Sequence, residues 1–323
     1  MTDWTGAAFS RRTFLATGFI AGAATALPAC AAPKKGFFER YKVPLGVQLF
    51  PVSADVRNDA HATFARLAKM GYQVIETAGL QGLTPVQFKA AADQAGLAIG
   101  GAHISAQLRG GGTDRVLIDD LAPLIDDLNA LTVRDVVMAL PLLPDDRVPA
   151  VDAHVLEKIL AILNTYTVSD WQRTAAFLNE RGERFRHAGM RLSYHNHNMD
   201  FRPIGDTTGW DVLMRETDPA LVSFEMDVGW VIAAGLDPLQ MLRRYPGRIR
   251  MLHVKDVDHT NKPNFKGEMI PATLGQGQVD WGPFLHAARD AGVTGYFVEQ
   301  EAPFKTTALD AMAESIAYLR QLA

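Results

Sequence analysis

The feature that most constrains the fold is a regular alternation between short apolar runs and longer amphipathic segments. Several amphipathic segments end in glycine, as in "RLAKMGY" and "AADQAGL", and glycine can adopt the left-handed conformation that closes a helix. Parallel strands need helical crossovers and bury both faces, so the alternation predicts an α/β fold with a parallel sheet. The eight apolar runs lie at 45–50, 72–79, 98–105, 133–140, 190–197, 222–228, 248–256 and 295–301.

Eight strand and helix units over roughly 280 residues predict one closed (β/α)8 barrel, or TIM barrel. A doubly wound open sheet is the alternative architecture. No change of composition suggests a second domain after residue 40, so we expect 43–323 to form the barrel and the basic stretch 33–42 to be a flexible linker. The long segments 106–132 and 141–170 predict enlarged loops or added helices beside the barrel mouth.

Ionisable residues gather at the carboxyl ends of the predicted strands. In a (β/α)8 barrel these ends form the mouth, where barrel enzymes carry out their chemistry. Side chains alternate between the two faces of a strand, so residues two apart, such as His195 and His197, point the same way. The strand-end residues are Glu76, His103, His195, His197, Asp227, His253, Lys255, Glu299 and Glu301.

Several imidazoles and carboxylates that converge inside a barrel need a cation or a polar ligand, because burying a charge without a partner costs several kcal/mol. A divalent metal ion would meet that need. Each residue taken alone has a plainer interpretation, since a histidine at a strand end is more often hydrogen-bonded packing than a ligand. The joint placement of these residues on successive strands is what favours a metal centre.

The chain from about residue 43 to its end resembles the xylose isomerase-like barrel family, also called the sugar phosphate isomerases/epimerases. The matching stretches are "YHNH", "EMDVGW", "RYPGRIRMLHVKD", "LGQGQVDW" and "GYFVEQE". The family includes ketose epimerases, inosose dehydratase and eliminases of 3-keto-glycosides. The resemblance is fairly specific for the family and says little about any one substrate.

The resemblance implies metal ligands at the ends of strands five to eight, where this chain has His195, Asp227, His253 and Glu299. The family commonly has Glu at the position of His195. A mixed set of imidazole and carboxylate ligands suits Mn, Zn, Co or Fe(II) better than Ca, without ranking them.

The reaction that the resemblance implies is removal of a proton beside a carbonyl, with enediolate chemistry. The ketose epimerases use two metal-bound Glu residues, and this chain keeps only Glu299, our first candidate for the general base. The loss of the second carboxylate favours isomerisation or elimination over a two-base epimerisation. His197 is a candidate catalytic partner, or else a residue that orients Asn196 or the mouth loops.

Further residues are implied as substrate contacts. Trp230 stands where the ketose epimerases have His, and it is also the feature that would favour a non-catalytic sugar-binding protein. The other implied contacts are Glu76, His103, Lys255 and Asp256. The motif "GQGQVD" lacks the lysine and the preceding strand of a phosphate loop, so we expect a tight turn there.

The N-terminus is typical of an export signal. Arg11 and Arg12 precede an apolar run of small residues, as in a twin-arginine signal over 1–32, which predicts a periplasmic protein. In "LPAC" the single cysteine, Cys30, resembles the lipidated residue of a lipoprotein, and cleavage after Ala31 is the alternative. Membrane attachment is expected only through this lipid or the signal.

The overall charge restricts the partners. A formal net charge of -4 and a pI near 6.1 offer no extended basic surface for nucleic acid, which also disfavours a metal-dependent endonuclease of related fold. The expected partner is a small carbohydrate. Phosphorylated sugars are chiefly cytoplasmic, so an exported protein is expected to act on a non-phosphorylated one.

Overall fold

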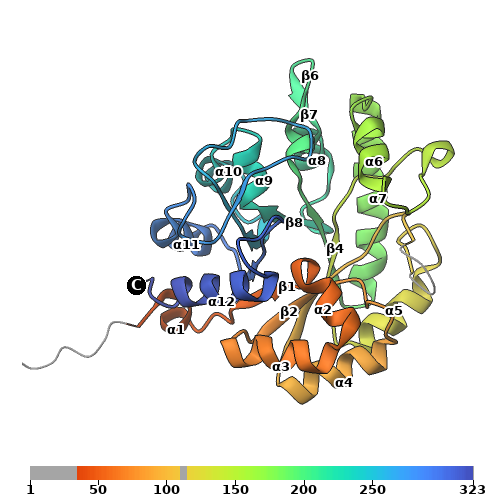
Figure 1. Ribbon diagram of the computed structural model, residues 1–323. Coiled ribbons are helices and arrows are strands. Elements are labelled where there is room, and N and C mark those ends of the chain that lie inside the picture. The colour runs from red at the N-terminus through yellow and green to blue at the C-terminus, as the bar shows by residue number, and fades with distance from the viewer. Residues whose placement is uncertain (1–34, 110–114, 323) are drawn as a thin grey trace, which may run out of the picture. The chain divides into compact units, whose positions relative to one another are not determined.

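The main strands close into a barrel, in a computed structural model that describes residues 35–109 and 115–322. The strands hydrogen-bond in the order β1-β2-β3-β4-β5-β8-β9-β12, and β12 returns to β1, each pair being parallel (Figure 1). The predicted (β/α)8 barrel is therefore confirmed. The barrel strands are β1 (Gly46–Gln48), β2 (Val74–Ala78), β3 (Ala98–His103), β4 (Asp135–Met138), β5 (Arg191–His195), β8 (Val222–Asp227), β9 (Ile249–Val254) and β12 (Gly295–Val298).

Helices connect the strands and surround the barrel (Figure 1). Their sequence signals are local: Thr84 caps one of them in a capping box with Gln87, and Pro85 occupies its first turn. The helices between strands are α3 (Ala60–Met70), α4 (Pro85–Ala95), α5 (Leu121–Ala130), α7 (Val168–His187), α8 (Gly209–Glu216), α10 (Pro238–Arg244), α11 (Trp281–Asp290) and α12 (Ala308–Leu319). None of the helices in the described ranges is long and apolar enough to cross a membrane.

Short elements decorate the loops. One added helix, α6, lies in the segment 141–170, as the length of that segment predicted. The short elements are η1 (Phe50–Val52), α2 (Ser53–Asn58), η2 (Asp145–Arg147), α6 (Val155–Leu163), η3 (Asn198–Phe201), β6 (Pro203–Ile204), β7 (Thr207–Thr208), α9 (Val228–Ala233), β10 (Asp256–Val257) and β11 (Pro271–Ala272).

The stretch before the barrel differs from the expected linker. Residues Phe37–Tyr41 form helix α1, and Phe37 is buried against Tyr296 of β12 and His286 of α11. The backbone N–H of Phe37 donates to the carbonyl of Leu322 at 2.8 Å. The expected flexible linker over 33–42 is thus wrong from Phe37 onward, because its aromatic residues bury apolar surface on the barrel. The predicted signal over 1–32, with Cys30, lies outside the described residues.

The barrel interior changes from apolar to charged toward the carboxyl ends of the strands. Val137, Met251 and Phe297 form a buried apolar cluster separate from the main core. Two residues farther along the same faces come His253 after Met251 and Glu299 after Phe297. The apolar layer therefore closes the bottom of the barrel, and the ionisable residues are left at the mouth.

Asp256 is a structural residue, which corrects its expected role as a substrate contact. It is fully buried on β10, and its neighbour Lys255 points to the opposite side, into the polar interior. Its carboxylate accepts hydrogen bonds of 3.0–3.3 Å from the indole Nε1 of Trp281 and from four backbone N–H groups, those of residues 257, 275, 277 and 279.

The turn "GQGQVD" is built around this carboxylate. A Cβ at Gly277 would lie 2.2 Å from Asp256 Oδ1, so only glycine allows the backbone to approach so closely. The expected tight turn in place of a phosphate loop is confirmed.

Replacing Asp256 should therefore destabilise the fold. We expect Asp256→Ala to lower the free energy of unfolding by about 3 kcal/mol or more, because several buried donors lose their acceptor. Asp237→Ala removes one exposed helix cap and should cost about 1 kcal/mol. Urea unfolding followed by circular dichroism measures both, and equal losses would contradict the role given to Asp256.

Candidate metal centre

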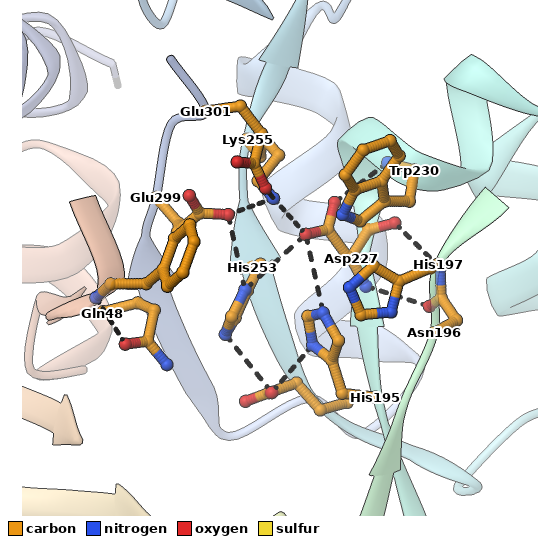
Figure 2. A network of polar contacts seen from close by, with 12 residues as sticks. Gln48, His195, Asn196, His197, Asp227, Trp230, His253, Lys255, Glu299 and Glu301 are labelled. Carbon is orange, nitrogen blue, oxygen red and sulfur yellow. Dashed lines mark hydrogen bonds and ion pairs between the residues drawn. The ribbon is translucent and has the colours of Figure 1, made fainter. Parts of the chain in front are cut away.

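Side chains from six barrel strands meet in one polar cluster, and Figure 2 shows the part of it around Asp227, His253 and Glu299. Each points inward because it shares a face with an interior residue earlier in its strand. Most are almost fully buried, and even His195, His253 and Glu299 expose no more than 3% of their surface. The members of the polar cluster are Glu76, His103, His195, Glu225, Asp227, His253, Lys255 and Glu299.

The four predicted metal ligands lie together at the outer end of this cluster. Asp227 Oδ2 is 3.6 Å from His253 Nδ1 and 3.8 Å from His195 Nε2, and Glu299 Oε2 is 3.9 Å from His253 Nδ1. These separations are too long for hydrogen bonds. His253 Nδ1 is buried and has no hydrogen-bond partner in the described part of the chain. Imidazole and carboxylate donors left facing one point in this way fit a divalent transition metal ion.

The motif "DVGW" explains how Asp227 is aimed. Its Oδ1 accepts a hydrogen bond of 2.9 Å from the backbone N–H of Trp230 and so caps helix α9. Its backbone N–H donates to Asn196 Oδ1 at 3.0 Å. One carboxylate oxygen is therefore fixed by the helix, and Oδ2 faces the centre and the Lys255 ammonium.

Lys255 lies beside the predicted ligands and contributes an ammonium group to the polar cluster. Its Nζ is 2.8 Å from Asp227 Oδ2, contacts Glu299 Oε2 directly and lies 3.1 Å from Glu301 Oε1. Burial acts to lower the pKa of Lys255, but these carboxylates outweigh burial and raise it well above its ordinary value. Burial also raises the pKa of Glu299, to about 7, although Lys255 opposes the rise.

Glu225 lies deeper in the barrel than the predicted ligands and contacts three imidazole rings. Its Oε2 lies 2.9 Å from His103 Nε2, 3.0 Å from His195 Nδ1 and 3.2 Å from His253 Nε2. Burial acts to raise the pKa of this carboxyl, but the histidines hold it well below its ordinary value. Burial and the neighbouring His253 lower the pKa of His195 to about 3, so its ring is neutral.

Glu76 shares this deeper layer, away from the place expected of a substrate contact. Its fully buried Oε2 lies 2.7 Å from His253 Nε2 and 3.2 Å from His103 Nε2, and it accepts a hydrogen bond of 2.9 Å from Gln48 Nε2. Burial acts to lower the pKa of His103, yet Glu76 and Glu225 raise it to about 9. Glu76 therefore has its role inside the cluster, whereas His103, with 15% of its side chain exposed, stays a predicted sugar contact.

His197 and Trp230 form a partly buried aromatic wall beside the centre (Figure 2). Their ring centroids are 5.5 Å apart, and the Lys255 ammonium lies 5.1 Å from the centroid of the Trp230 ring. His197 Nδ1 and Trp230 Nε1 have no hydrogen-bond partner among the residues described. The two atoms leave a donor and an acceptor for a polar ligand.

Comparison with known proteins decides the family. The model of the family described as xylose isomerase-like TIM barrel matches residues 64–322. The chain belongs to that family. An inosose dehydratase of Lacticaseibacillus casei is 30% identical over 167 residues, which cover 48% of this chain and 55% of that one. The chain thus spans about half the length of the curated relatives that it matches.

Solved structures share the fold. A sugar phosphate isomerase/epimerase from Parabacteroides distasonis has a TM-score of 0.64 and 23% identity, covering 93% of this chain and 98% of that one. A 3-keto-D-glucoside 4-epimerase from Escherichia coli has a TM-score of 0.56 and 17% identity, covering 86% and 99%. As a member of the xylose isomerase-like family, the chain is similar to enzymes of sugar isomerase, epimerase and dehydratase types.

Two polar residues of this family member escaped the sequence analysis. Glu225 precedes Asp227 by two residues and so shares its face, the same alternation that paired His195 with His197. Gln48 ends the first strand and pairs with Glu76. Both lie at strand ends in the sequence, and the alternation rule applied to every strand would have found them.

The metal centre predicts a defined stoichiometry. We expect the purified parent protein to hold about one equivalent of a divalent transition metal, and the double variant His253→Ala, Asp227→Ala to hold none, because two of four donors are gone. His197→Gln is the matched control, since His197 lies outside the donor group. Elemental analysis with circular dichroism of each variant measures this. A parent that stays free of metal after reconstitution would contradict the centre.

The loop that carries His197 predicts a pH-dependent stability. Buried Asp200 accepts hydrogen bonds from the His197 N–H at 3.0 Å and the Tyr194 hydroxyl at 3.1 Å, yet burial raises its pKa from 3.8 to about 7. The folded state thus binds a proton that the unfolded state has lost, and stability should fall as pH rises from 5 to 7.

We expect Asp200→Asn to remove this term, so that the variant gains about 2 kcal/mol relative to the parent between pH 5 and pH 7. Asp206→Asn, an exposed change in the same region, controls for loss of a charge. Chemical unfolding across this pH range measures the difference. A constant offset between Asp200→Asn and the parent would disprove the assignment.

Proposed function

We propose that the protein is a divalent-metal-dependent enzyme of isomerase or epimerase type that removes a proton beside the carbonyl of a non-phosphorylated sugar. The observation that carries the proposal is Glu299. Its carboxylate is buried at the mouth beside Asp227 and His253, with Oε1 free of hydrogen-bond partners in the described residues. A general base must reach the proton it abstracts, and this oxygen is the one left available.

The residues around Glu299 have distinct roles in the proposed reaction. A bound divalent ion would supply a Lewis acid that stabilises negative charge on the substrate oxygens. His195, Asp227, His253 and Glu299 would hold the ion. Glu299 Oε1 takes the proton, and the adjacent Lys255 ammonium supplies a positive charge next to the reacting atoms. His197 and Trp230 orient the sugar from one side, with Nδ1 and Nε1 available for its hydroxyls.

The charge of the site favours a neutral sugar. Within the described residues, Lys255 is the cation that contacts the centre, and three carboxylates already surround it. A phosphate group is usually bound by an uncommitted Arg or Lys, or by a helix N-terminus. We further propose export to the periplasm through the signal at Arg11 and Arg12, with possible anchoring by a lipid on Cys30, which would bring the enzyme to non-phosphorylated sugars.

Elimination is the second candidate, and the position of the carboxylates favours it. His195 replaces one of the two Glu residues on which ketose epimerases rely, and Glu76 and Glu225 are bonded to histidines in the deeper layer. Glu299 therefore has no carboxylate opposite it to return a proton on the other face. The similarity to an inosose dehydratase supports the same outcome, which is loss of a β-substituent after proton removal.

Proton exchange with solvent tests the proposal. The metal-loaded protein, incubated in D2O with keto-inositol, 3-keto-glucosides and free ketoses, should place deuterium on the carbon beside the carbonyl of one of them. Glu299→Gln should lower the rate of exchange by about 100-fold or more, because the amide cannot accept the proton. Asp237→Asn is the control, because it changes the exposed cap of helix α10 and no member of the polar cluster.

The products separate the candidates. Nuclear magnetic resonance would detect a rearranged or inverted sugar after isomerisation or epimerisation, and an unsaturated ketone after elimination. Saturable binding of a sugar without exchange or product would overturn the enzymatic proposal and favour a sugar-binding protein.

A further inference from the structure

We propose that Glu225 is a positioning residue: from beneath the metal centre, and together with Glu76, it fixes the ring tautomers of His195 and His253 so that both present an unprotonated nitrogen to the metal. The inference rests on the proposed metal centre and does not depend on which sugar reacts. It assigns to Glu225 a task that explains why a carboxylate lies fully buried among three imidazoles.

The surroundings of Glu225 Oε2 indicate which ring nitrogens carry hydrogens. Three ring nitrogens lie within 3.2 Å of this one carboxylate oxygen, and a carboxylate oxygen accepts hydrogen bonds from N–H groups. The ring nitrogens next to it, His195 Nδ1 at 3.0 Å and His103 Nε2 at 2.9 Å, must therefore carry hydrogens. His253 Nε2 lies between Glu76 Oε2 at 2.7 Å and Glu225 Oε2 at 3.2 Å, and both carboxylates require a hydrogen there too.

The hydrogens next to Glu225 determine which ring nitrogen of His195 and His253 faces the metal centre. A neutral imidazole carries one hydrogen, so a hydrogen on Nδ1 of His195 leaves its Nε2 with a free lone pair. On His253 the hydrogen on Nε2 lies between two carboxylates, and a metal ion would take the place of any hydrogen on Nδ1. These two nitrogens lie 3.8 Å and 3.6 Å from Asp227 Oδ2, close to the spacing of about 3 to 3.5 Å expected for donors that share one ion.

The deeper residues could instead be read as a second metal site, because His103, His195, Glu225 and His253 offer four donor atoms. The distances disfavour this. The three nitrogens all lie at hydrogen-bond distance from one oxygen of Glu225, and that oxygen already fills the point on which they converge. A second ion would also need the nitrogens that carry hydrogens here. The carboxylate therefore serves the histidines, and one ion is expected.

Two substitutions of Glu225 test whether its hydrogen-bond acceptor or its negative charge matters for metal binding. Glu225→Gln removes the charge but keeps a carbonyl oxygen that can accept from His195 Nδ1–H. Glu225→Leu removes both while filling a similar volume. If the tautomer is what matters, Glu225→Leu should weaken metal binding by about 10- to 100-fold, and Glu225→Gln by much less. Equal losses in the two variants would show that only the charge acts, and would overturn the proposal.

A measurement on the parent protein does not depend on whether a Glu225 variant folds. With 15N-labelled histidine in the metal-loaded protein, we expect His195 to carry its hydrogen on Nδ1 and His253 on Nε2. The His195 signal is assigned by its loss in His195→Asn. A hydrogen on His195 Nε2 would refute the inference, as would two metal equivalents per chain with both lost in Glu225→Leu.

These results are distinguishable from failure of the proposed function. Metal affinity and ring tautomers are measured without any substrate. If no sugar reacts while Glu225→Leu still loses the metal and Glu225→Gln keeps it, the reaction is wrong and the role of Glu225 stands. If a sugar reacts and both variants bind metal as tightly as the parent, the reaction stands and the role of Glu225 is wrong.

Discussion

Burial of four carboxylates inside one barrel is the constraint on which the rest of the site depends. Glu76, Glu225, Asp227 and Glu299 are each at most 3% exposed, and they face a single buried ammonium, that of Lys255. Ionised groups removed from water must be paired or must bind a cation. The imidazoles share the deeper carboxylates, and Lys255 shares the outer pair, yet donor atoms at the mouth remain without partners. A divalent cation would give those donor atoms a partner.

The fold tolerates this charge because the same strands also carry the apolar layer beneath it. Phe297 fills the barrel interior so closely that a Cβ at Gly46 would lie 2.5 Å from its ring. Glu299 follows two residues later on the same face. Each strand thus contributes packing in its first half and chemistry at its end. The parallel barrel directs all of those ends to one mouth, which is why residues more than 200 positions apart, such as Glu76 and Glu299, lie in one cluster.

Sequence patterns predicted the architecture and most of the cluster, since strand alternation and strand ends are local properties. The strand face on which each residue lies could be predicted, but its depth inside the barrel could not. Glu76 and Glu299 were both predicted at strand ends, yet Glu76 lies in the middle of β2, beneath the histidines, whereas Glu299 directly follows β12 at the opening. Asp256 shows the other limit. It neighbours Lys255 and therefore faces outward, where four donors from a distant turn and helix bind it, and no local pattern reveals those partners.

The replacement of a carboxylate by His195 has consequences that extend through both layers. A neutral imidazole in place of an anion would leave a bound ion with more positive charge and so make it a stronger Lewis acid. In the proposed reaction it would also remove the second base and leave proton transfer to Glu299. A carboxylate ligand needs no tautomer, whereas His195 coordinates only if Nε2 is unprotonated. The histidine therefore needs an acceptor behind it, and Glu225, 3.0 Å from its Nδ1, is that acceptor. His195 and Glu225 thus act as one unit, with the lost carboxylate replaced by an imidazole and an anion one layer deeper.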